Sequence, residues 1–326
     1  MSVFSTPHWP MIEQKNTSNL RTVSPRTSVG EDGFTLVEIM VAAAVLGLLL
    51  VSLVQVASAV ADTWSTGHAR AERRQHGRAI VDFIGRELRS AALPVHRAVL
   101  SDKADLQFVL NPTSLSTDLK NPHALFWQAP VATDTSQGAL AQVGYFVHWD
   151  GNKPMLCRMF INPGSSDYLI YDANKIGSWM NEGITNAATP AVQNGWVGLF
   201  AEDVMGFWVR CLDRNGQPIV QNGGAGLYDS RAPYSSTVDD VTTAYEAPVL
   251  PFYVEISIVT VDSRTTDRFD ASTKAAIMDV VKSPGTLNAA AFIEALKTQA
   301  AARKDLLPVL RSAVPYQIQV YLENSP

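Results

Sequence analysis

The strongest constraint on this chain is an uncharged apolar block near its N-terminus. Residues 39 to 61 contain no Asp, Glu, Lys or Arg and consist mostly of Ala, Val and Leu. A helix of about 20 residues is long enough to cross the hydrocarbon core of a bilayer. Its backbone N–H and C=O groups are all paired within the segment, as an apolar environment requires. The block therefore predicts one transmembrane helix.

A single acidic residue, Glu38, immediately precedes this uncharged run. A carboxylate deep in lipid costs about 2.5 kcal/mol or more, and a simple membrane anchor has no use for one. Glu38 therefore needs either a place at the membrane interface or a partner of opposite charge. Residues 1–33 show no hydrophobic periodicity and are rich in Ser, Thr, Pro and Asn. This composition predicts a leader peptide.

The residues Gly33 to Glu38, G-F-T-L-V-E, together with the apolar run resemble the processing signal of type IV prepilins and type II secretion pseudopilins. The resemblance implies that a prepilin peptidase cuts between Gly33 and Phe34 and methylates the new amine of Phe34. It also implies that Glu38 pairs with the terminal amine of a neighbouring subunit during assembly. Two features depart from the family pattern: Glu31 and Asp32 stand where Lys or Arg is usual, and the leader is long.

The same resemblance implies a topology and a set of partners. The leader is expected in the cytoplasm, the helix in the lipid of the inner membrane as a single pass, and the remainder in the periplasm until assembly into a filament. The expected partners are the prepilin peptidase and other pilin or pseudopilin subunits. An alternative is visible in Ala57-Ser58-Ala59, a small-x-small site at which ordinary signal peptidase would cut after Ala59 and release a secreted periplasmic protein. An uncleaved anchor is the third possibility.

The apolar block leads into an amphipathic stretch. Ile80, Ile84 and Leu88 recur at helical spacing, and Pro94 ends the pattern. We therefore expect one long helix over 34–92, half of it in lipid or filament core and half packed on a head domain. An anchor followed by a separate helix is the alternative, with Gly67 and Gly77 as places for a break.

The head, residues 93–326, is predicted to be rich in antiparallel β-structure. Strands are expected at 106–110, 124–128, 143–149, 154–161, 168–171, 204–212, 251–262 and 316–322. Asp150 to Lys153 and Asp213 to Gly216 carry turn signals. Inserted loops are expected near 213–248 and 263–315, the second more helical. The fold class is thus α+β and pilin-like: a long N-terminal hydrophobic helix packed on a β-rich antiparallel head.

Three further segments indicate a subfamily. The helix end RAIVDFIGRELRSA is followed by LFAEDVMGFWVRCLDRNGQ and then by VLPFYVEISIVTVDS. This order resembles that of J-type minor pseudopilins and PilW-like minor pilins, and also that of pilin-like Verru_Chthon cassette proteins.

Little in the sequence points to catalysis or to a cofactor. The net charge is -5, and the last two-thirds of the chain carry no dense basic patch, which argues against nucleic acid as a main partner. The histidines are scattered, and the acids Asp150, Asp213, Asp239 and Asp240 lack the alternating oxygen ligands of a calcium loop. Cys157 and Cys211 are either a disulfide pair or two separate buried thiols.

The sequence therefore predicts a structural, non-enzymatic subunit: a minor pilin or pseudopilin of a type IV pilus-like or type II secretion filament. The large, irregular head favours a tip or initiating position over the shaft. The alternative is an adhesin or substrate-recognition head carried on a pilin stem.

Overall fold

A computed structural model describes residues 34–93, 106–175, 177–181, 184, 197–221, 224, 226–238 and 240–325. The predicted leader and Gly33 lie outside the described residues. The chain forms two compact units, Met1–Ser65 and Thr66–Pro326, and the division falls within the first helix.

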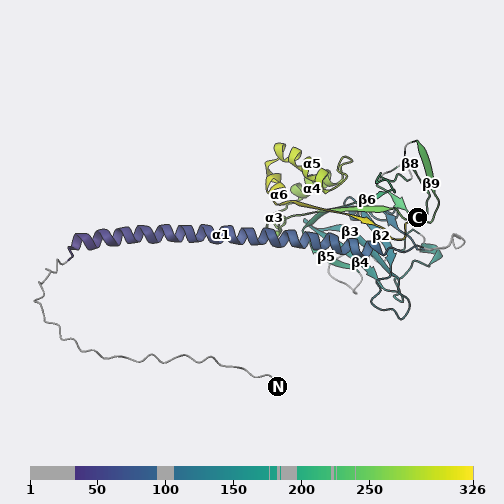
Figure 1. Cartoon of the computed structure of the whole chain (residues 1–326), viewed down its shortest axis with the longest axis horizontal. Coiled ribbons are helices and arrows are strands. Elements are labelled where there is room, and N and C mark those ends of the chain that lie inside the picture. The colour runs from purple at the N-terminus through teal and green to yellow at the C-terminus, as the bar shows by residue number, and fades with distance from the viewer. Residues whose placement is uncertain are drawn as a thin grey trace, which may run out of the picture. The chain divides into compact units, whose positions relative to one another are not determined.

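The first helix, α1, runs without interruption over Leu36–Arg89 (Figure 1). In its first part, Leu36–Ala61, none of the apolar side chains is buried within the chain. In its last turns Ile80, Val81, Ile84 and Leu88 are all buried. The helix is continuous, so the alternative of an anchor followed by a separate helix is wrong.

A six-stranded sheet forms one layer of the head, in the order β5-β4-β3-β2-β1-β7. Its strands are β1 (Val109–Leu110), β2 (Ala124–Ala129), β3 (Ala141–Asp150), β4 (Lys153–Ile161), β5 (Val197–Glu202) and β7 (Tyr228–Asp229). Every neighbouring pair is antiparallel. The pairing of Asp150 with Lys153 leaves Gly151 and Asn152 as a two-residue turn, and Gly151 has the positive φ of 57° that such a turn needs.

A three-stranded antiparallel sheet forms the second layer, in the order β11-β10-β6. Its strands are β6 (Val204–Leu212), β10 (Tyr253–Thr260) and β11 (Val314–Tyr321). A separate two-stranded hairpin pairs β8 (Tyr234–Val238) with β9 (Val241–Tyr245). The fold confirms the prediction of a long apolar helix followed by a β-rich antiparallel head.

Helices occupy the stretch between the neighbouring strands β10 and β11. They are α3 (Ser263–Thr266), α4 (Ala271–Val281), α5 (Ala289–Ala302) and α6 (Leu307–Ser312). Asp270 and Asn288 cap α4 and α5 by accepting hydrogen bonds from the backbone N–H groups of Thr273 and Ala291. Trp208 points from β6 toward these helices, and its ring lies 5.4 Å from that of Phe292.

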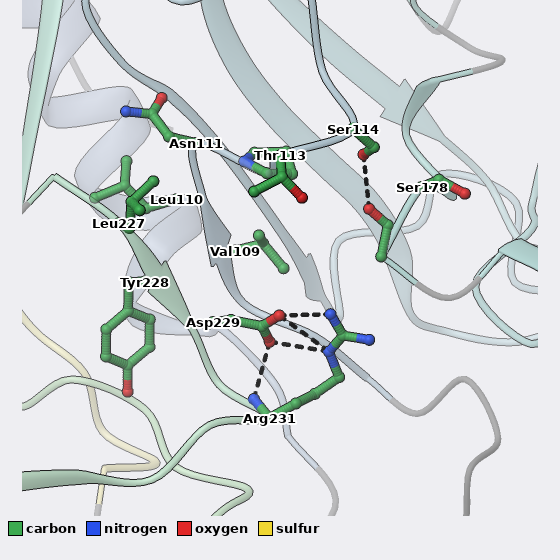
Figure 2. A pocket seen from close by; sticks show the side chains of 12 residues that line it. Val109, Leu110, Asn111, Thr113, Ser114, Ser178, Leu227, Tyr228, Asp229 and Arg231 are labelled. Carbon is green, nitrogen blue, oxygen red and sulfur yellow. Dashed lines mark hydrogen bonds and ion pairs between the residues drawn. The ribbon is translucent and has the colours of Figure 1, made fainter. Parts of the chain in front are cut away.

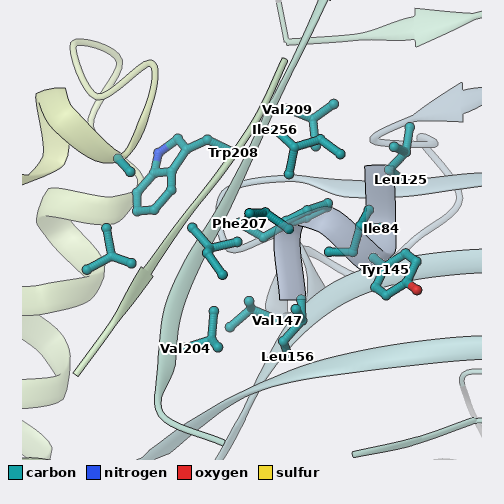
Figure 3. Packing of buried hydrophobic residues seen from close by; sticks show 14 of the residues in the cluster. Ile84, Leu125, Tyr145, Val147, Leu156, Val204, Phe207, Trp208, Val209 and Ile256 are labelled. Carbon is teal, nitrogen blue, oxygen red and sulfur yellow. The ribbon is translucent and has the colours of Figure 1, made fainter. Parts of the chain in front are cut away.

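The main core lies where α1 meets both sheets. Figure 3 shows Ile84 of α1 among Tyr145, Val147 and Leu156 from the six-stranded sheet and Val209 and Ile256 from the three-stranded sheet. A smaller core covers the other face of the six-stranded sheet. On β2, Leu125 and Trp127 belong to the main core, whereas Ala124 and Phe126 belong to the smaller one. This alternation follows from the two-residue period of a strand.

Two predictions about the head were wrong, and one strand was missed. Residues 168–171 form no strand, because Ile170 enters the smaller core from a turn and Tyr168 donates its hydroxyl hydrogen bond to the Leu140 carbonyl. The stretch 213–248, predicted as a loop, contains β7, β8 and β9. Their Ser, Thr and Tyr residues give little apolar alternation for sequence analysis to detect. Strand β5 was not predicted.

Candidate functional site

The N-terminal end of α1 carries the predicted processing and assembly residues. Phe34 is 77% exposed and precedes the helix. The hydroxyl of Thr35 accepts a hydrogen bond from the backbone N–H of Glu38 at 3.2 Å, and the Thr35 carbonyl accepts one from Ile39. Thr35 is thus the N-cap residue, and Thr35-Leu36-Val37-Glu38 has the spacing of a capping box. This T-x-x-E pattern is visible in the sequence but was not predicted as a helix start.

The position of Glu38 in the first turn has an electrostatic consequence. Unpaired N–H groups at a helix N-terminus carry a partial positive charge, so the first turn is a favourable place for a carboxylate. The Glu38 side chain is exposed and so remains accessible to another molecule. Gly33, the predicted residue before the cut, lies outside the described residues, so the structure places Phe34 and Glu38 but not the scissile bond.

The stretch Leu36–Ala61 is long and apolar enough to cross a membrane, by length and composition. Large exposed side chains such as Leu49, Leu53 and Val54 find no partner in the described part of the chain. Contiguous exposed apolar surface of this size marks a surface that is covered by lipid or by another protein.

The other end of α1 is fixed to the head by a buried polar group. Glu87 accepts a hydrogen bond from the Tyr145 hydroxyl at 2.5 Å and forms an ion pair with Arg158. Burial and the negative charge of Glu87 raise the pKa of Tyr145 well above its usual value. Burial opposes the charged form of Arg158, but its hydrogen bond with Glu87 leaves the pKa of Arg158 raised. The guanidinium also lies 4.3 Å from the centre of the Phe160 ring.

Close packing supports the same attachment. A Cβ atom on Gly77 would lie 2.2 Å from the ring of Tyr316, and one on Gly85 would lie 3.1 Å from Ile318. Tyr316 and Ile318 both belong to β11. This strand therefore packs closely against α1 at the two glycines, which have no side chain. Gly77, considered in the sequence as a possible break, instead makes room for a tyrosine ring within a continuous helix.

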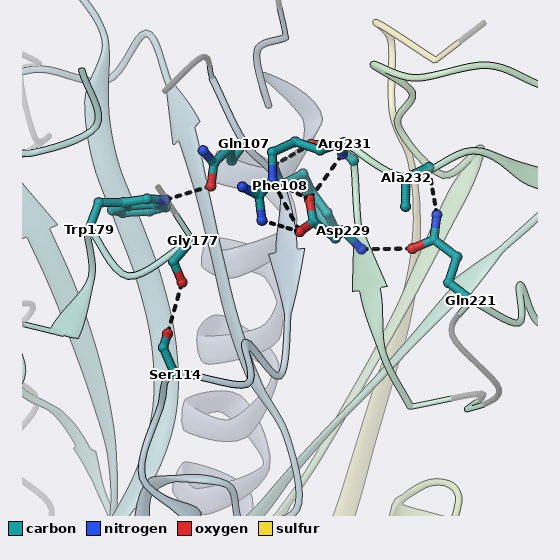
Figure 4. Close-up of polar contacts among 10 residues, drawn as sticks. Gln107, Phe108, Ser114, Gly177, Trp179, Gln221, Asp229, Arg231 and Ala232 are labelled. Carbon is teal, nitrogen blue, oxygen red and sulfur yellow. Dashed lines mark hydrogen bonds and ion pairs between the residues drawn. The ribbon is translucent and has the colours of Figure 1, made fainter. Parts of the chain in front are cut away.

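A cleft of about 290 Å³ lies beside β1 and β7 (Figure 2). Its most polar element is the ion pair of Asp229 with Arg231, whose guanidinium donates to both carboxylate oxygens. This hydrogen bond raises the pKa of Arg231. Across the cleft Ser114 donates to the Gly177 carbonyl at 2.8 Å (Figure 4). The two charges of this ion pair, Asp229 and Arg231, are therefore paired with each other.

The two cysteines are both buried and free. Cys157 belongs to the smaller core and Cys211 to the main core. Burial raises the pKa of Cys157 to about 12 and also raises that of Cys211. The suggested Cys157–Cys211 disulfide is therefore not present, and the alternative of two separate buried thiols describes them.

The remaining sequence candidates are dispersed. Among the described residues no group of three or more His, Cys, Asp and Glu is placed to hold a metal ion. Asp213 accepts backbone hydrogen bonds from Asn215 and Gln217 and so stabilises its own turn. His123 accepts the backbone N–H of Val209 at 2.8 Å, and burial lowers its pKa to about 4. Asp239 and His96 lie outside the described residues.

Comparison with known families finds one match. Residues 30–54 match the prokaryotic N-terminal methylation motif. No curated protein matches the chain, and no solved structure matches it. The matched segment includes Gly33, Phe34 and Glu38 and ends within the apolar part of α1. It supports a type IV pilin-like precursor that is processed at this motif and anchored in the membrane by one helix.

Proposed function

We propose that this protein is a minor pilin or pseudopilin, a structural subunit of a type IV pilus-like or type II secretion filament. The observation that carries the proposal is the methylation motif at residues 30–54, which leads directly into an exposed apolar helix. The same helix continues to the head and is fixed there by Glu87. The helix anchors the precursor in the inner membrane and packs with other subunits after assembly.

In this proposal the prepilin peptidase cuts between Gly33 and Phe34 and methylates the Phe34 amine. Glu38 of one subunit then pairs with the terminal amine of a neighbour. An unpaired carboxylate and an unpaired ammonium are each costly in an apolar bundle, whereas their pairing offsets the cost and sets the axial register. The large head and its helical insertion favour a tip or initiating position, since such a head is hard to repeat along a shaft.

The test is the N-terminal mass of the protein isolated from membranes. A start at N-methylated Phe34 supports the proposal, and a start at Val60 would mean an ordinary secreted protein. Abundance tests the position in the filament, because a tip subunit is present in far fewer copies than the main subunit. Finding this chain as the main component of purified filaments would overturn the tip assignment but not the processing.

A further inference from the structure

Beyond Glu38 in its first turn, the apolar part of α1, Leu36–Ala61, contains one large polar side chain, Gln55. The nearby hydroxyl of Ser58 is satisfied within the helix, because it donates to the Gln55 carbonyl oxygen at 2.9 Å. Thr63 does the same with the Ala59 carbonyl at 2.7 Å. A carboxamide is more demanding, since it has two N–H donors and an acceptor oxygen. The Gln55 side chain is exposed, and no hydrogen bond to it is found within the described part of the chain.

The depth of Gln55 in the membrane makes its unsatisfied carboxamide important. It lies six residues before the end of the span at Ala61 and sixteen after Ile39, or about 9 Å and about 24 Å along the helix. Gln55 is therefore inside the hydrocarbon region when the helix spans a bilayer about 30 Å thick. Lipid tails offer no hydrogen bonds, so the carboxamide is unsatisfied there unless another polar group reaches it.

Two small residues, Gly47 and Ser58, lie on the same face of the helix as Gln55. Gly47, Val51, Gln55 and Ser58 follow one another at spacings of four, four and three residues and so share one face. The space beside Gly47 is open. Small residues let two helix backbones approach closely in a membrane, and a Gln side chain then forms a hydrogen bond across the interface.

We propose that Gln55 joins two copies of this chain in the membrane before filament assembly. A second copy is the partner that fits without further assumption, because it has the same orientation and brings an identical carboxamide to the same depth. The carboxamide is self-complementary, since an N–H of each copy donates to the oxygen of the other. The proposal needs a membrane-spanning helix, as the proposed function does, but it does not depend on processing or on a filament.

The experiment measures self-association of the full chain in vesicles of phosphatidylethanolamine and phosphatidylglycerol. Donor and acceptor dyes are attached at Leu287→Cys, an exposed site on the head, while the buried native thiols stay unreactive. Energy transfer is followed as the ratio of protein to lipid is varied. Gln55→Leu removes the carboxamide, Gln55→Asn keeps it, and Leu53→Ala changes a residue outside the proposed face.

We expect the unsubstituted chain, Gln55→Asn and Leu53→Ala to associate similarly. Gln55→Leu should weaken the association constant roughly five- to thirtyfold, the effect of one hydrogen bond between membrane helices in model peptides. Equal association of Gln55→Leu and the unsubstituted chain, or monomers throughout, would overturn the proposal. The N-terminal mass of the same chain expressed in cells keeps the two ideas separate. A processed chain that associates without regard to Gln55 contradicts only the pairing, and an unprocessed chain that pairs through Gln55 contradicts only the proposed function.

Discussion

The two ends of α1 have the same secondary structure but obtain their packing partners in opposite ways. Between Leu36 and Ala61 every side chain is exposed, including the largest apolar ones. Between Ile80 and Leu88 the apolar side chains are buried against two sheets. A helix in water is stabilised mainly by the packing of an apolar face rather than by intrinsic propensity. The first part must find that packing outside the chain, and the last part finds it within.

Because the two parts of α1 differ in this way, assembly and folding should depend on different parts of the helix. Substitutions at the exposed end should leave the head intact and change membrane insertion or subunit contacts. Substitutions at the packed end should unfold the head before they change any contact with another subunit.

The largest effect is expected at Glu87. Glu87→Ala removes one partner of a buried ion pair and leaves Arg158 and the Tyr145 hydroxyl unsatisfied. Breaking such a pair costs about 3–5 kcal/mol. Because the Arg158 side chain is 22% exposed, we expect a loss near the lower limit. Urea unfolding of the detergent-solubilised chain, followed by tryptophan fluorescence, measures it.

Asp82→Ala is the matched control for Glu87→Ala, since Asp82 is an acidic residue on the same helix with an exposed side chain. Its unfolding free energy should change by less than about 0.5 kcal/mol. If the two variants lose the same stability, the ion pair does not attach α1 to the head.

A second prediction compares apolar residues at the two ends of α1 directly. Ile84→Ala leaves a cavity at a fully buried site and should cost about 2–4 kcal/mol of head stability. Leu49→Ala removes the same kind of side chain from an exposed site and should leave the unfolding free energy of the head unchanged. Urea unfolding of both variants gives the two values. A stability loss in Leu49→Ala equal to that of Ile84→Ala would show that the head depends on the first part of the helix.

The pH dependence of the head gives a third prediction, which centres on His123. Its pKa is about 4 in the folded chain and about 6.5 in the unfolded chain, so between these values the unfolded state binds more protons. The stabilising contribution is complete above pH 6.5 and is lost as the pH falls toward 4. Each pKa unit is worth about 1.36 kcal/mol, and since the residue as a whole is intermediate in exposure we expect a loss of about 2–3 kcal/mol.

Urea unfolding at pH 7, 5.5 and 4 measures the slope, with His123→Gln as the comparison. The variant keeps a side-chain acceptor for the Val209 N–H but does not titrate, so its stability should vary less over this range. Carboxylates contribute to both proteins equally, and only the difference between the two slopes reports on His123. Identical slopes would contradict the lowered pKa.

Local patterns in the sequence predicted much of the fold. The helical spacing of Ile80, Ile84 and Leu88 predicted the buried stripe, and Asp150 to Lys153 predicted the hairpin turn. These patterns work because the residues that decide the structure are neighbours in the chain. The methylation signal is equally local, since its residues lie within a few positions of each other.

Contacts between distant residues could not be predicted in this way. Glu87 and Arg158 are 71 residues apart, and neither has a sequence context that identifies the other. The role of Gly77 depends on Tyr316, a residue of the last strand. The hairpin of β8 and β9 escaped prediction because much of it is exposed and polar, which removes the alternation that identifies a half-buried strand.

The smallest effects are expected from two glycines of α1. Gly67→Ala adds a methyl group where nothing lies within 4 Å, so the gain in helix propensity of about 1 kcal/mol should appear as a slightly higher Tm. Gly77→Ala has the same gain, but its Cβ would lie 2.2 Å from the Tyr316 ring, which is only 9% exposed. Moving a packed ring costs about 1–3 kcal/mol, so the net change should be a loss of about 1 kcal/mol. Thermal unfolding followed by circular dichroism distinguishes Gly67→Ala from Gly77→Ala. Equal stabilisation by both variants would mean that Tyr316 moves freely and that β11 does not hold the helix at Gly77.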